Sequence, residues 1–128
     1  MSLAGRLFGQ AAESEAERYL RSKGYSILAR NERTPSGELD LVTRSGPVLV
    51  FVEVKARGSS THGGAIGAVD GRKQARLVRL AAQYLASHRL RDQPCRFDVI
   101  LCEGGTDAPA VVEHIEHAFE VPGDDLRW

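Results

Sequence analysis

An acid and a base stand at the end of an apolar segment at residues 48–55, which reads V-L-V-F-V-E-V-K. Side chains alternate along a strand, so Glu53 and Lys55 share one face about 7 Å apart. The preceding segment at 37–44, G-E-L-D-L-V-T-R, predicts a facing strand on which Glu38, Asp40, Val42 and Arg44 share a face. A four-residue turn at 45–48 then sets Asp40 opposite Glu53 and Glu38 opposite Lys55.

Two carboxylates that face each other repel unless a cation or a proton lies between them. Oxygen ligands of this kind suit a hard divalent ion such as Mg²⁺ or Mn²⁺. Lys55 on the same face could neutralise charge that builds on a phosphate. The spacing is equally compatible with an exposed hairpin, in which Glu38 pairs with Lys55 and Asp40 with Arg44 in ordinary solvated ion pairs.

The elements that would position these residues follow from hydrophobic periodicity and turn signals. The expected ranges are a helix at 10–23, strands at 25–30, 38–44, 48–55, 96–102 and 110–115, and a helix of about 18 residues capped by Asp70. A glycine-rich loop is expected at 58–69, and frayed tails at 1–8 and 121–128. The order predicts one α/β domain over residues 1–128, with a central mixed sheet of four to five strands flanked by helices.

The formal net charge of zero conceals a strong polarity along the chain. Residues 55–91 carry eight Lys and Arg against one acid, whereas residues 92–128 carry nine acids against two Arg. The candidate phosphate-contacting residues in the basic part are Arg57, Arg72, Lys73, Arg76 and Arg79. A solvated charged helix face is the ordinary alternative. A third reading is an interaction protein whose acidic C-terminal third docks a basic partner or a second copy of the chain.

The same motifs resemble those of a known superfamily. G-E-L-D-L-V at 37–42 followed by E-V-K at 53–55 resembles the D-(x)n-E-x-K signature of the PD-(D/E)xK nucleases. Together with N-E-R at 31–33, V-F-V-E-V-K-A-R at 50–57, Lys73, R-F-D-V-I at 96–100 and H-A-F at 117–119, it resembles the bacterial YraN-like family. That family is similar to archaeal Holliday junction resolvases.

The resemblance implies a restriction-endonuclease-like core and a set of site residues. Asp40 and Glu53 would be metal ligands, Lys55 the catalytic lysine, and Glu13 a fourth member that binds the metal directly or through water. Position 12 is Ala where that family usually has Gly. The implied cofactor is Mg²⁺ or Mn²⁺.

The implied function is a metal-dependent endonuclease that hydrolyses DNA phosphodiester bonds in branched, junction or single-stranded DNA, with a homodimer as the expected assembly. The alternative is a non-catalytic nucleic-acid-binding module with the same fold. The two readings differ in whether the carboxylates bind a metal.

Other residues place the chain in a cellular setting. Neither an apolar leader nor a stretch of roughly 20 apolar residues occurs, which predicts a cytoplasmic protein without membrane contact. Cys95 and Cys102 are an odd number of residues apart, so they are expected on opposite faces of one strand as buried thiols. His88, His114 and His117 lack a helical metal-ligand spacing and are expected to be non-catalytic, and His62 is expected to be a polar residue of the glycine-rich loop rather than a catalytic one.

Overall fold

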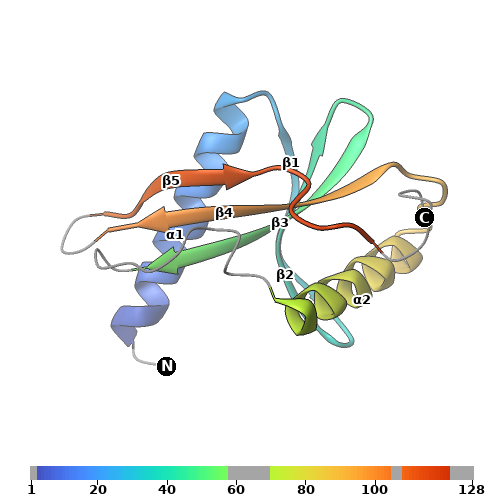
Figure 1. The fold of residues 1–128 in the computed structure, drawn as a ribbon, viewed down its shortest axis with the longest axis horizontal. Coiled ribbons are helices and arrows are strands. Elements are labelled where there is room, and N and C mark those ends of the chain that lie inside the picture. Colours follow the sequence, from blue (N-terminus) through green and yellow to red (C-terminus); the bar gives the residue numbers. More distant parts are fainter. Residues whose placement is uncertain (1–2, 58–69, 105–107, 122–128) are drawn as a thin grey trace.

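The computed structural model describes residues 3–57, 70–104 and 108–121 (Figure 1). The elements are α1 (Leu3–Ser22), β1 (Ser26–Thr34), β2 (Gly37–Ser45), β3 (Val48–Arg57), α2 (Gly71–Ser87), β4 (Cys95–Glu103) and β5 (Ala110–Ile115). The glycine-rich loop expected at 58–69 and the tail at 122–128 lie outside the described residues. The α/β architecture and the mixed sheet are confirmed.

The five strands form one sheet in the order β1-β2-β3-β4-β5. Neighbours are antiparallel except β3 and β4, which run parallel. A parallel connection needs a crossover, and α2 supplies it between those two strands. The central position of β3 explains its sequence, because a strand with neighbours on both sides and helices over both faces is apolar along most of its length.

Each face of the sheet carries one helix, which Figure 1 shows for α1 and α2. The first apolar cluster packs α1 on the sheet and contains Ala12, Ala16, Leu20, Tyr25, Leu41, Val50, Val52, Ile100 and Cys102. The second packs α2 on the sheet and includes Leu39, Val42, Leu49, Phe51, Leu77, Leu80, Tyr84, Cys95 and Phe97. Alternation along β3 is therefore confirmed: Val50 and Val52 face α1, and the face that continues to Glu53 and Lys55 lies toward α2.

The helix ends follow local rules, with one departure from expectation. Asp70 caps α2, and its carboxylate accepts the Lys73 backbone N–H at 2.9 Å. Gly24, with φ +92°, lets the chain turn after α1. However, α1 begins at Leu3 and so takes in residues 3–8, which the sequence predicted to fray. At the other end of the chain, Val121 is buried rather than frayed.

The positions of the two thiols agree with expectation. Cys95 and Cys102 are buried and free, and they belong to the clusters on opposite faces of the sheet. Burial raises the pKa of each thiol to about 11, so both are unreactive at neutral pH. Within the described residues, neither helix combines the length and apolar character that crossing a membrane requires.

Candidate functional site

The two predicted metal ligands, Asp40 and Glu53, lie next to each other. The β2–β3 ladder pairs Leu41 with Val52 and continues to Ser45 with Val48. One further step in this register sets Asp40 opposite Glu53, as the four-residue turn predicts. Their carboxyl groups are close enough to shift each other's pKa, by hydrogen bonding and, at Glu53, by the charge of Asp40.

The Asp40 side chain is fixed by the backbone of the neighbouring strand. Its Oδ2 accepts the Val54 backbone N–H at 2.9 Å. The contact lies just beyond the last β2–β3 backbone pair, Leu41 with Val52. At this point a carboxylate oxygen accepts the hydrogen bond that a backbone carbonyl oxygen would accept within the ladder. Asp40 is thereby held at the place where Glu53 emerges from β3.

The surroundings of both carboxyl groups disfavour the charged form. Burial is the largest cause that raises the pKa of Asp40 and that of Glu53, and the Asp40 charge raises the pKa of Glu53 further. Lys73 and Arg76 on α2 act in the opposite direction on Glu53, but they do not cancel the shift. The pair is therefore a half-buried acidic centre whose charge the protein compensates only in part.

Glu13 approaches the pair from the other helix. Its pKa is raised to about 7, first by burial and then by the charges of Asp40 and Glu38, while a hydrogen bond from Asn31 opposes the shift. Arg76 on α2 in turn acts on Asp40. Asp40 therefore lies within electrostatic reach of both helices, although they cover opposite faces of the sheet.

The side chains around Asp40 do not alternate between the two faces of the sheet as the sequence predicted for β2. The sequence predicted that Asp40 and Val42 share a face, with Leu39 and Leu41 on the other. In the structure Leu39 and Val42 both pack in the α2 cluster, whereas Leu41 packs in the α1 cluster. The alternation is interrupted between Leu39 and Leu41, beside an irregular residue of β1, Asn31, whose φ is +48°.

The exposed-hairpin alternative does not describe these strands. Glu38 forms an ion pair with Arg33 of β1 at 3.6 Å and stands outside the β2–β3 ladder that would set it opposite Lys55. Arg44 lies against the Pro47 carbonyl at 3.5 Å, while Asp40 contacts Val54 and Glu53.

The predicted basic residues divide into two groups. Lys55 is half-buried on the α2 side of β3, two residues after Glu53, and Arg57 closes the same strand. On α2, Arg72, Arg76 and Arg79 are exposed and Lys73 is half-buried. Lys73 and Arg76 therefore lie near enough to act on the acidic pair, and Arg72 and Arg79 extend the basic surface of α2.

A second buried aspartate lies on β4 and was only partly foreseen. The spacing of Arg96 and Asp98 predicts a structural pair, and Arg96 Nε donates to Asp98 Oδ1 at 2.8 Å. The sequence did not indicate that His114 Nε2 contacts Asp98 Oδ2 at 2.8 Å or that the His117 backbone N–H donates to Oδ1 at 3.0 Å. Burial alone would raise the pKa of Asp98, but these hydrogen bonds outweigh it and lower that pKa.

Ligand geometry alone would favour a metal at this second centre. Among the described residues, three ligand atoms lie within 4.8 Å of one another at Asp98, His114 and Glu116, and not at Glu13, Asp40 and Glu53. However, Arg96 Nη2 donates to Asp98 Oδ2 at 3.1 Å and to Glu116 Oε1 at 3.2 Å. A guanidinium already supplies the positive charge here, so the centre around Asp98 is structural.

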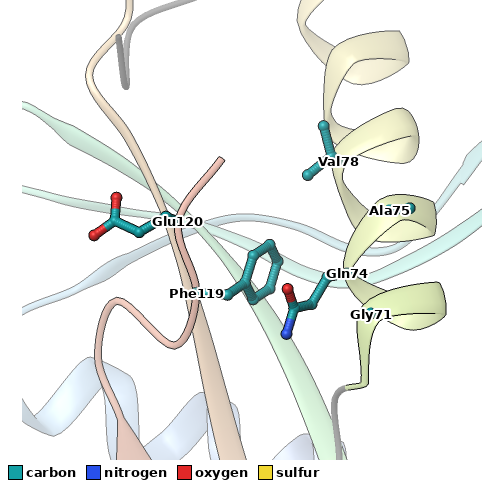
Figure 2. A pocket seen from close by; sticks show the side chains of 6 residues that line it. All are labelled: Gly71, Gln74, Ala75, Val78, Phe119 and Glu120. Carbon is teal, nitrogen blue, oxygen red and sulfur yellow. The ribbon is translucent and has the colours of Figure 1, made fainter. Parts of the chain in front are cut away.

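Figure 2 shows a pocket of about 250 Å³ between α2 and the segment after β5. Its described lining consists of Gly71, Gln74, Ala75, Val78, Phe119 and Glu120. The Gln74 side chain and the Phe119 ring lie on facing sides of this space. The described lining includes no predicted site residue. A smaller pocket of about 160 Å³ is lined by Glu13, Asn31 and Leu41 among others.

Comparisons with known proteins agree with the motifs. The family model of the uncharacterised protein family UPF0102 matches residues 12–102. A UPF0102 protein of Pseudomonas entomophila is 47% identical over 113 residues, which cover 88% of this chain and 92% of that protein. A UPF0102 protein of Symbiobacterium thermophilum is 46% identical over 114 residues, covering 89% and 97%.

Among solved structures, Pyrococcus furiosus SfsA in complex with Ca²⁺ matches with a TM-score of 0.36 and 14% identity, over 91% of this chain and 65% of that one. This likeness is too distant to indicate a shared fold or function. The family match and the identities to its members are decisive by themselves. The chain therefore belongs to UPF0102, the family that the YraN-like motifs indicated.

Proposed function

We propose that the chain is a divalent-metal-dependent nuclease that hydrolyses phosphodiester bonds of DNA, with branched or junction DNA as its substrate. The observation that carries this proposal is the proximity of the half-buried Asp40 and Glu53 carboxyl groups, with Lys55 two residues further along the same strand. The resemblance to the D-(x)n-E-x-K signature supports the same assignment.

The donor set fits a hard divalent cation. Asp40 and Glu53 offer carboxylate oxygens, which Mg²⁺ and Mn²⁺ prefer. Burial raises the pKa of both carboxyl groups, and the charges of Glu38 and Asp40 raise the pKa of Asp40 and Glu53 respectively, so a cation would relieve an unfavourable charge that Lys73 and Arg76 leave partly uncompensated. Glu13 stands further back, which suits a ligand that acts through water. A bound Mg²⁺ would lower the pKa of a coordinated water and stabilise charge on the phosphate.

The chain's own residues have distinct tasks in this reaction. The Val54 backbone N–H fixes Asp40 Oδ2, so the second carboxylate oxygen keeps a constant position. Glu53 enters from the adjacent strand. Lys55 is placed to stabilise the extra negative charge of the phosphorane-like transition state.

The basic surface of α2 supports a nucleic-acid substrate. Arg72, Arg76 and Arg79 are exposed on a helix whose Lys73 and Arg76 reach the acidic pair electrostatically. A phosphate backbone that follows this helix would arrive at the carboxylates. Contacts of this kind position DNA without reading its sequence, which agrees with a substrate recognised by shape.

The test is cleavage of four-way, flapped and single-stranded DNA by the purified protein with Mg²⁺, with Mn²⁺ and with EDTA. We expect cleavage that requires the metal and is lost in Asp40→Ala and Lys55→Ala. Arg33→Ala, which changes an exposed ion pair on the same strands, is the matched control and should cleave normally. Absence of cleavage by the wild-type protein on all three substrates would reject the nuclease.

The second candidate is a nucleic-acid-binding module without catalysis. The exposed arginines of α2 favour it, because they provide phosphate contacts independently of the carboxylates. It predicts DNA affinity that falls steeply with salt and no stabilisation by Mg²⁺. Melting temperatures with and without the metal separate the two functions.

A further inference from the structure

Asn31 has an unusual backbone for a residue in a strand. Its φ is +48°, and of the four non-glycine residues with positive φ in the described part of the chain it alone lies within a strand. Left-handed backbone is disfavoured for residues with a side chain, and asparagine is among those that tolerate it best. Such a conformation persists where the surroundings fix it, and it is frequent at functional sites.

Asn31 lies beside Asp40 in the sheet. On one side of it Arg30 pairs with Leu41, and on the other Glu32 pairs with Leu39. Asn31 and Asp40 are the two residues between these pairs, at the point where the alternation of β2 is interrupted. The irregularity of β1 therefore coincides with the position of a predicted metal ligand.

A group that attracts the Glu13 side chain is required to keep it near Asp40. The Asp40 and Glu38 carboxylates repel it, and it borders a pocket of about 160 Å³ that would admit other side-chain positions. Asn31 lines the same pocket, and its side chain favours the charged form of Glu13 and so lowers the Glu13 pKa. The amide is thus in a position to hold Glu13 close to Asp40 rather than turned into the pocket.

We propose that Asn31 is a positioning residue whose left-handed backbone directs its amide to the Glu13 carboxylate and fixes that carboxylate beside Asp40. The consequence for metal binding rests on the proposed function. A group that orients a ligand in this way typically changes metal affinity 10–100-fold when it is removed, so the expected loss is roughly tenfold or more.

The first experiment separates the amide from the backbone. Asn31→Gly keeps the left-handed conformation without strain and removes the amide, whereas Asn31→Ala removes the amide and strains the backbone. Calorimetric titration with Mn²⁺ should show about tenfold weaker binding for Asn31→Gly than for the wild type, at an unchanged or higher melting temperature. Asn31→Ala should melt at a lower temperature than Asn31→Gly.

Ser14→Ala is the matched control, because Ser14 lines the same pocket and is exposed. It should bind Mn²⁺ as the wild type does. Binding by Asn31→Gly within twofold of the wild type would overturn the proposal, because the amide would then contribute nothing to the site.

A second measurement needs no metal. The side-chain amide signals of Asn31 in ¹⁵N-labelled, metal-free protein should shift on Glu13→Ala, since the hydrogen bond is lost. Unchanged signals would overturn the positioning role. Shifted signals in a wild-type protein that binds no Mn²⁺ would reject the proposed metal site and leave the positioning of Glu13 intact, so the two failures are distinguishable.

Discussion

Asp40, which is half-buried, and Asp98, which is buried, belong to one sheet, and their negative charges are compensated to very different degrees. Asp98 is 1% exposed and receives hydrogen bonds from Arg96, His114 and the His117 backbone, which lower its pKa. Asp40 receives the Val54 N–H and shares a hydrogen bond with another carboxyl group, and its pKa is raised.

This difference in charge compensation indicates which of the two aspartates would bind a cation. At Asp98 the chain supplies the positive charge itself, and every carboxylate oxygen is used. At Asp40 the charge is left partly uncompensated beside a second acid, which costs stability in the folded protein. A fold that retains such a cost commonly does so at a functional site. The following predictions test this contrast.

The largest effect is expected from Asp98→Asn. Removing the buried partner of this ion pair leaves the Arg96 charge against the more exposed Glu116 and costs about 3–5 kcal/mol of unfolding free energy. Asp40→Asn should cost less than about 1 kcal/mol without metal, because it also removes repulsion with Glu53. Urea unfolding in EDTA measures both. Equal losses of unfolding free energy in the two variants would show that the two aspartates contribute to stability in the same way.

Next in size is stabilisation by Mn²⁺. At a metal concentration 100 times the dissociation constant, binding adds about 2.7 kcal/mol to the free energy of unfolding, or on the order of 10 °C in melting temperature. Asp40→Asn should abolish this increase. Glu116→Gln, at the other centre, should retain it. A loss with Glu116→Gln and not with Asp40→Asn would place the metal at Asp98.

The two centres should also give opposite pH dependences. Glu13, Asp40 and Glu53 have raised folded pKa values, so the stability they contribute is present below their unfolded pKa values and is lost as pH rises through the folded ones. In EDTA, wild-type stability should fall between pH 5 and pH 8, on the order of 1 kcal/mol because partial exposure of Glu13 screens its charge. Asp40→Asn should flatten this fall.

Asp98 has a lowered folded pKa, so its contribution is present above the unfolded value and is lost as pH falls through the folded value. Asp98→Asn should therefore change the acid limb, below about pH 4, and leave the slope between pH 5 and pH 8 unaltered. Unfolding curves across pH that change in the same window for both variants would contradict the contrast.

The smallest effects on stability are expected on the surface of α2. Arg72→Ala and Arg79→Ala should change unfolding free energy by less than about 0.5 kcal/mol, unlike Arg96→Ala. Each should reduce the slope of log affinity for DNA against log salt by about 1 unit, because one phosphate contact is lost. Fluorescence anisotropy over a salt series measures this. Unchanged slopes would exclude α2 as the DNA surface.

Much of the fold was predictable from local patterns. The alternation along β3, the turn at 45–48 and the cap at Asp70 are short-range signals, and the elements they predict are present. The hairpin register brings Asp40 to the level of Glu53, but the interrupted alternation of β2 at this residue was not predictable from it. The start of α1 at Leu3 was not predicted, although Leu3 and Leu7, and Ala4 and Phe8, are apolar pairs at helical spacing.

The remainder depends on contacts between distant segments. Asn31 gave no local sign of a left-handed backbone, and its hydrogen bond to Glu13 joins α1 to β1. His114 reaches Asp98 because β5 pairs with β4, a register that follows a loop rather than a tight turn. Such features arise from packing, which residue spacing along one element does not encode.

The most direct test of the central claim is anomalous diffraction from crystals of the wild-type protein soaked in Mn²⁺. The account predicts a manganese peak bound by Asp40 and Glu53, with Glu13 facing it, and none at Asp98, His114 and Glu116. Density without a peak at Asp40 and Glu53, or a peak at Asp98 instead, would contradict it.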